Sequence, residues 1–138
     1  MKLSLLERCF MKSSTEAWVD KAEGDWAVAG RELRARRSPN YDAACFHAQQ
    51  CAEKYLKGQL QEEGIAFPWT HDLLALLDLL LPSHPLWGAF RPALLQLKNY
   101  AVAFRYPGDA ADKKEAREAV KLCQGVREAV RLGFGLPT

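Results

Sequence analysis

The sequence predicts an all-α protein: an up-and-down bundle of about five helices, with a four-helix core plus one short helix. Apolar residues recur every three to four positions over long stretches, and no stretch alternates apolar and polar residues as a half-buried strand does. Short segments rich in Pro, Gly and Asn separate these stretches, which favours antiparallel neighbours. At 138 residues the chain has the size of one domain. We expect an N-terminal extension at residues 1–12 and a single helical domain at 13–138.

The first helix is expected over residues 13–36. Ser13 and Glu16 have capping-box spacing, and a basic run followed by Ser38-Pro39-Asn40 ends the helix. The second is expected over 40–63, where Gly64 suits a left-handed C-cap. The apolar positions of the first helix are Trp18, Ala22, Trp26, Ala29 and Leu33, and those of the second are Ala44, Ala48, Cys51, Ala52, Tyr55, Leu56 and Leu60.

Three further helices are expected over residues 71–81, 87–104 and 111–132. Thr70 would cap the short leucine-rich helix, and Pro82 would end it. Pro92 suits a first helical position, so the next helix could instead begin near Arg91. The predicted core of the bundle contains Trp18, Trp26, Leu56, Leu77, Phe90, Leu94, Leu97 and Val126.

The composition narrows the class of protein. Lys plus Arg number 19 and Asp plus Glu 17, so nucleic-acid binding would need a local basic patch. The four cysteines form no C-x-x-C pair, so we interpret them as buried small residues of a reducing compartment and expect no metal or cofactor. Glu7 and Arg8 interrupt the N-terminal apolar run, and no stretch reaches the roughly 20 apolar residues of a membrane span. We therefore expect a cytoplasmic protein without membrane attachment.

Two groups of residues in the middle of the chain are candidates for a binding site. One flank of the second helix carries Gln50, Glu53, Lys54 and Lys57. This flank is either a solvated face with an internal Glu53–Lys57 pair or part of a site. His71, which precedes Asp72, is either a plain exposed residue at a helix start or a side chain aimed at a phosphate or a partner.

A third candidate is the turn after the fourth helix, where Arg105 and Tyr106 precede Pro107-Gly108. Arginine presents a fixed fork of donors that suits phosphate, and tyrosine offers a stacking face. Arg105 could equally cover the last carbonyl groups of the fourth helix. The glycine-rich, nucleophile-elbow and zinc-protease motifs of common enzymes are missing from the sequence.

Together these elements resemble the HEPN domain family. Residues 48–57 read AQQCAEKYLK, similar to the family's A-Q-Q-A-A-E-K-x-L-K string. Gly64 followed by Thr70-His71-Asp72-Leu73 is similar to its G…T-H-D-L element, and Arg105-Tyr106-Pro107 to its R-Y-P turn. The start at Trp18, Ala22 and Asp25 also fits, so the resemblance spans about residues 17 to 129.

The resemblance implies a five-helix bundle, commonly a homodimer, associated with nucleotides or RNA. Many members are encoded beside a minimal nucleotidyltransferase and act with it as a toxin–antitoxin type pair. Other branches are metal-independent ribonucleases with an Arg followed four to six residues later by a His. No histidine follows Arg105 in this chain, so the usual acid–base partner is missing and the resemblance does not make the chain an enzyme.

Our main hypothesis is a HEPN-domain protein that binds a nucleotide or RNA phosphate group and works with a separate minimal nucleotidyltransferase. One rival is a divergent ribonuclease toxin that uses Arg105 and His71, and the other is a non-catalytic helical interaction module. If the second helix runs antiparallel to the third, the ligand-binding candidates meet at one end of the bundle or across a dimer seam. These candidates are Lys54, Lys57, His71, Arg105 and Tyr106, and the remaining family-signature residues are Gln50, Glu53, Asp72 and Pro107.

Overall fold

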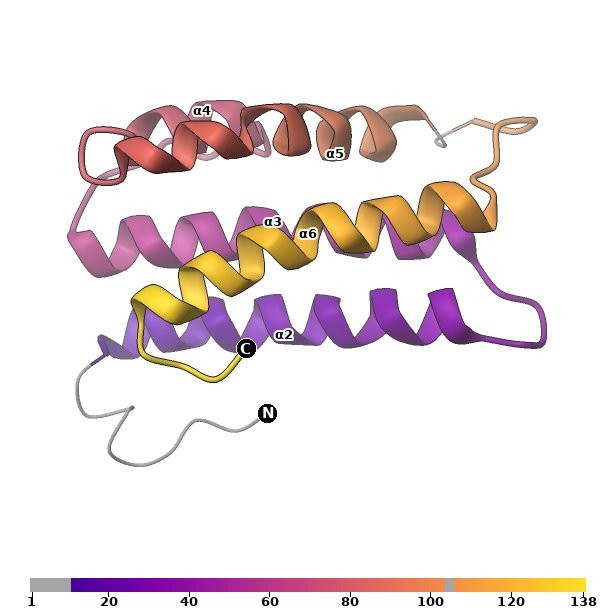
Figure 1. The fold of residues 1–138 in the computed structure, drawn as a ribbon, viewed down its shortest axis with the longest axis horizontal. Coiled ribbons are helices and arrows are strands. Elements are labelled where there is room, and N and C mark those ends of the chain that lie inside the picture. The colour runs from indigo at the N-terminus through magenta and orange to yellow at the C-terminus, as the bar shows by residue number, and fades with distance from the viewer. Residues whose placement is uncertain (1–10, 104–105) are drawn as a thin grey trace.

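The computed structural model describes residues 11–103 and 106–138, which form helices and connecting segments without a strand. The predicted all-α class is therefore confirmed. The helices, shown in Figure 1, are α2 (Ser13–Arg34), α3 (Tyr41–Glu63), α4 (Leu73–Leu80), the 3₁₀ helix η1 (Pro85–Phe90), α5 (Arg91–Ala103) and α6 (Lys113–Gly133). Among the residues described, no helix is both long and apolar enough to cross a bilayer.

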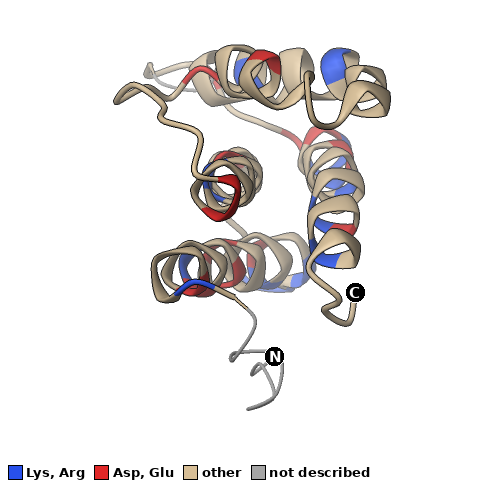
Figure 2. Cartoon of the chain, turned by 90° about the vertical axis from the view of Figure 1, so that its left-hand side faces the viewer, with Lys and Arg blue, Asp and Glu red and all other residues tan. Residues whose placement is uncertain are grey.

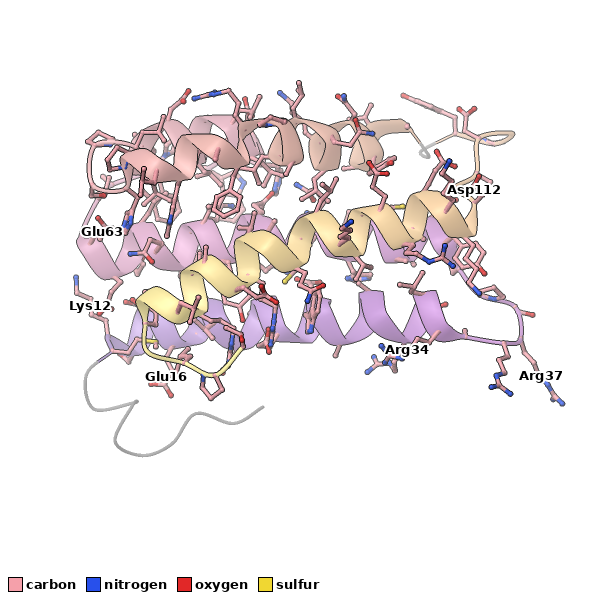
Figure 3. All side chains as sticks on the ribbon, viewed as in Figure 1. Lys12, Glu16, Arg34, Arg37, Glu63 and Asp112 are labelled. Atoms are coloured by element: carbon pink, nitrogen blue, oxygen red, sulfur yellow. The ribbon has the colours of Figure 1, made fainter. Side chains whose placement is uncertain are left out.

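The four long helices α2, α3, α5 and α6 alternate in direction, as an up-and-down bundle requires (Figure 1). Lys12 and Glu63 lie at one end of the molecule, and Arg37 and Asp112 at the other (Figure 3). The backbone N–H of Ala111 donates to Asp42 Oδ1 over 2.6 Å, which ties the segment before α6 to the start of α3. The central helix α3 packs against α2, α4, α5 and α6, so more than half of its residues are buried.

The short helix α4 runs parallel to α3, so the expected antiparallel arrangement of these two helices is wrong. His71, before α4, contacts Glu53 in the middle of α3, whereas His84, after α4, contacts Glu63 at its end. The cause is the segment 64–72, which separates the two helices. At about 3.3–3.6 Å per extended residue it is long enough to pass back along α3 before α4 begins.

The helix starts depend on caps that the sequence located only in part. Asn40 Oδ1 accepts from the Ala43 N–H over 2.9 Å at the start of α3. Helix α4 is capped by Asp72, whose Oδ1 accepts from the Leu74 N–H, while Thr70 accepts from the Asp72 N–H. The predicted cap at Thr70 is thus two residues too early, because an aspartate closer to the leucines competes for the same role.

The start of α2 is held by another helix and not by its own capping box. Lys12 is the N-cap and makes no side-chain cap bond. Glu62 Oε1, from the end of α3, instead accepts from the Lys12 N–H over 3.1 Å and from the Thr15 hydroxyl over 2.8 Å. The capping-box prediction at Ser13 and Glu16 is therefore wrong, although the helix begins at Ser13 as expected.

The expected helix 87–104 divides into η1 and α5, which begins at Arg91 as the alternative interpretation of Pro92 allowed. Of the predicted core, Leu56, Leu77, Leu94, Leu97 and Val126 are buried. The other three predicted core residues, Trp18, Trp26 and Phe90, are only half-buried. Their rings are large and lie at the edges of the helix layers, where Trp18 meets Phe67, Trp26 meets Arg127, and Phe90 meets Trp87.

Candidate functional site

Two residues of the polar flank of α3, Glu53 and Lys57, are buried, and Gln50 and Lys54 are half-buried, so its interpretation as a solvated face is wrong. Glu53 is 2% exposed and Lys57 3%, and Gln49 beside them is also buried. Trp69 and His71, in the segment before α4, lie against Lys57 and Glu53 of this flank. A buried charge is costly unless it is paired and hydrogen-bonded, and the pairing of these residues is the first feature of the site.

Glu53 is the common partner in this buried cluster. Lys57 Nζ donates to Glu53 Oε2 over 3.1 Å, which confirms the expected pair within the helix. His71 Nδ1 donates to Glu53 Oε1 over 3.1 Å, and Gln49 Nε2 approaches the same oxygen at 3.4 Å. A carboxylate on one ring nitrogen fixes the orientation of an imidazole and directs its other nitrogen, Nε2, away from that carboxylate.

Lys57 is enclosed between aromatic rings as well as paired. Its ammonium lies 5.5 Å from the ring centroid of Trp18 and 5.5 Å from that of Trp69. These are cation–π distances, and the partly desolvated setting strengthens such contacts. Lys57 can therefore act on a ligand through Glu53 and His71, which it helps to position, and not by direct contact.

Lys54 belongs to a different cluster, between α2 and α3. Its Nζ donates to Asp25 Oδ2 over 2.6 Å, and His47 Nδ1 donates to Asp25 Oδ1 over 2.7 Å. Asp25 is itself buried. The structure therefore places Lys54 against α2, and does not bring it to His71.

A groove lies beside His71, between the middle of α3, the start of α4 and the second half of α5. Its volume is about 400 Å³, within the range of small-molecule sites. A second hollow of about 340 Å³ continues from it, with Phe46 and Ala101 in common. The first groove is lined by Phe46, Gln49, Gln50, His71, Asp72, Lys98, Ala101 and Val102.

Lys98 is a groove residue that the sequence interpretation missed. Its Nζ lies 3.4 Å from Asp72 Oδ1, an oxygen that also accepts from the Leu74 N–H. Both side chains are partly exposed, so this ion pair contributes at most about 1 kcal/mol. In the sequence, Lys98 is only a lysine beside the apolar stripe of α5. It can be recognised as a groove residue only once the packing of α4 against α5 is known.

Charges of both signs lie on the part of the surface near the groove. Figure 2 shows Lys and Arg interspersed with Asp and Glu on the ribbon seen from the Glu63 end. The groove follows the same pattern: its lining includes the imidazole of His71, the ammonium group of Lys98 and the carboxylate of Asp72. Recognition of an anion there would depend on two or three local contacts.

The two remaining ligand-binding candidates follow α5. Arg105 lies outside the described residues. Tyr106 is exposed and begins a turn in which its carbonyl accepts from the Asp109 N–H over 3.1 Å and Gly108 has a φ of +94°. This turn leads to Asp112 at the Arg37 end of the bundle (Figure 3). The last described turn of α5, with Ala101 and Val102, lines the groove.

A second network of largely buried side chains joins α2, α3 and α6. Arg127 donates through Nε and Nη2 to the two oxygens of Glu23, each over 2.8 Å, and Tyr55 donates to Glu23 over 2.6 Å. Burial raises the pKa of Glu23, but the hydrogen bonds from Arg127 and Tyr55 outweigh burial and hold it below its ordinary value. Burial, with the hydrogen bond to Glu23, raises the pKa of Tyr55 far above its usual range. This network fixes three helices to one another.

The geometry agrees with what comparison with known proteins shows. The HEPN domain family model matches residues 15–132, so the chain belongs to the HEPN family. It is similar to the crystal structure of TT1696 from Thermus thermophilus, with 30% identity and a TM-score of 0.77 over 88% of this chain and 98% of that one. It is also similar to ST0689, an archaeal HEPN homologue, with 25% identity and a TM-score of 0.63 over 87% and 97%. No curated protein matches the chain.

Proposed function

We propose that this HEPN-domain protein binds the phosphate of a nucleotide or of RNA in the groove between α3 and α5. In this proposal it works with a separate minimal nucleotidyltransferase, as one half of a toxin–antitoxin type pair. The observation that carries the phosphate site is the Glu53–His71 contact of 3.1 Å. It leaves the imidazole exposed at the edge of a groove that also contains Lys98.

The chemistry of these groups supports an anionic ligand. A protonated imidazole donates from Nε2, and an ammonium group donates from up to three positions. Charge-assisted hydrogen bonds of this kind contribute about 1.5–3 kcal/mol each. A phosphate would compete with Asp72 for Lys98, and a weak exposed ion pair costs little to give up. Arg105 is retained as a ligand candidate from the sequence, because a guanidinium fork suits a phosphate.

Binding can be tested with a fluorescently labelled single-stranded RNA and competing nucleotides, by anisotropy. Lys98→Gln and Arg105→Ala are each expected to weaken binding about tenfold or more, since one such contact is worth at least a decade in affinity. Lys121→Gln on the exposed face of α6 is the matched control and should bind like the unmodified protein. Absence of RNA and nucleotide binding by the unmodified protein, or an equal loss in the control, would reject the site.

The partner is tested separately. We propose that a minimal nucleotidyltransferase is encoded beside this chain, and we expect it to co-purify with the chain at a fixed ratio when the two are co-expressed and only one is tagged. RNA incubated with the purified HEPN protein should stay intact, because the Arg…His pair of the ribonuclease branches is missing. Failure of the two chains to associate would remove the partner from the proposal. RNA cleavage that disappears in His71→Ala would replace this function with a ribonuclease.

A further inference from the structure

We infer that Trp69 is a stacking surface for an unpaired nucleobase, so that the ligand of the groove is a nucleotide with a free base and not a duplex phosphate. This inference rests on the proposed function and specifies its ligand. It is carried by the exposure of Trp69, by the groups that hold its ring, and by its place beside His71.

Trp69 differs from the other tryptophans of the chain. It is 90% exposed, although burying an indole is one of the largest apolar contributions that a side chain can make. Each of the others is half-buried: Trp18 packs on Phe67, Trp26 on Arg127, and Trp87 on His84. The stability of the fold does not explain why the indole of Trp69, in the segment 64–72, is left exposed to solvent.

The exposed ring is nevertheless held in place. Lys57 Nζ lies 5.5 Å from its centroid, and the ring of His71 lies 6.5 Å away at an interplanar angle of 71°. Both neighbours are hydrogen-bonded to Glu53, which is buried. One carboxylate thus orders both the imidazole and the cation behind the indole. A ring positioned in advance loses less conformational freedom when a ligand stacks on it.

The neighbours of Trp69 indicate what would stack there. An indole is a platform for any flat π system, and proteins that bind single-stranded nucleic acid use such rings to stack bases. A base on Trp69 places its sugar and phosphate beside His71, at the edge of the groove that holds Lys98. Bases inside a duplex are already stacked and cannot reach an isolated ring. The ligand is therefore a mononucleotide or a single-stranded segment.

Calorimetric titrations with AMP, ribose 5-phosphate and a short oligoadenylate test this inference. Trp69→Ala should weaken the binding of AMP or oligoadenylate about tenfold to a hundredfold, the usual effect of losing one stacked base. It should leave ribose 5-phosphate binding unchanged, because that ligand has no base. Trp69→Phe should retain most of the affinity. Leu86→Ala, at another exposed apolar side chain, is the matched control and should behave like the unmodified protein.

Fluorescence gives a second readout that a purely structural role of Trp69 would not change. AMP should quench the tryptophan emission of the unmodified protein, and Trp69→Phe should lose that quenching while it still binds. If Trp69→Ala binds AMP and oligoadenylate as tightly as the unmodified protein, the stacking inference is wrong and the phosphate site stands. If the unmodified protein binds none of the three ligands, the proposed function fails and the inference fails with it. An effect confined to oligoadenylate supports stacking and identifies RNA as the source of the base.

Discussion

Glu53 shows how much of the site depends on one side chain. It is 2% exposed and accepts hydrogen bonds from Lys57 and His71, and Lys57 in turn lies against Trp18 and Trp69. The string that carries the family resemblance is therefore a structural cluster under the segment 64–72. In the proposed site the cluster acts on the ligand through His71, whose side chain is 68% exposed.

Glu53→Gln is expected to lower the free energy of unfolding by about 3–5 kcal/mol, because it leaves the buried Lys57 ammonium without a counter-charge. Urea denaturation followed by circular dichroism measures this. Glu118→Gln, on the exposed face of α6, should change stability by less than about 0.5 kcal/mol. A Glu53→Gln protein as stable as the Glu118 control would show that the cluster does not hold the segment.

Glu23 should make the stability of the protein depend on pH in the acid range. Its pKa in the folded protein is lowered by Arg127 and Tyr55, so its contribution is complete above the pKa of the unfolded chain. That contribution is lost as the pH falls through the folded value. Thermal melts from pH 7 to pH 3 should therefore show a smaller decline for Glu23→Gln, which also melts lower at pH 7. Parallel curves for the two proteins would contradict this assignment.

At the scale of helices, the sequence predicted most of the fold because apolar spacing reports helices directly. Ranges for α2, α3 and α6 were correct within about two residues at each end, and Gly64 ends α3 as expected. The direction of α4 was not predictable, because it depends on the extended path of residues 64–72 and not on any periodicity. The sequence identified His71, a groove residue, as a candidate but not Lys98. Lys98 reaches Asp72 only because α5 packs beside α4, and the sequence does not show that packing.

Gly64 and Gly24 provide a matched pair of helix substitutions. Gly64 has a φ of +69°, a conformation that costs an L-residue about 1–2 kcal/mol, so Gly64→Ala should destabilise the protein by about that amount. Gly24 lies within α2, and a Cβ built there meets nothing within 4 Å. Gly24→Ala should stabilise by up to about 1 kcal/mol. Chemical denaturation measures the free energy of unfolding of both variants. Changes of the same sign in the two variants would contradict these roles of the two glycines.

For the whole molecule, the distribution of exposed apolar side chains favours association. Phe46 and Val102 line the groove from α3 and α5, and Leu95 lies seven residues before Val102 on α5. All three are exposed. Contiguous exposed apolar side chains commonly mark a contact surface. We propose a two-fold homodimer, the commonest symmetry of soluble oligomers, in which this surface forms the seam and the groove lies along that seam.

Sedimentation velocity at micromolar concentration should give twice the 15.5 kDa mass of one chain. Val102→Glu places a charge in the proposed interface and should shift the protein to a monomer. Leu132→Glu, at an exposed leucine of α6, should remain dimeric. If the unmodified protein sediments as a monomer, the proposed dimer does not form. If only Leu132→Glu dissociates the dimer, the interface lies on α6 and not on this surface.

In the proposed function, the groove between α3, the start of α4 and α5 binds a nucleotide phosphate. An NMR titration of ¹⁵N-labelled protein with AMP tests it most directly. Saturable shifts are expected at the indole N–H of Trp69 and at the backbone amides of Gln50, His71, Asp72 and Lys98. Amides of the exposed α6 residues Lys114, Arg117 and Lys121 should stay unchanged. Shifts concentrated on α6, or no saturable shift at any residue, would contradict the account.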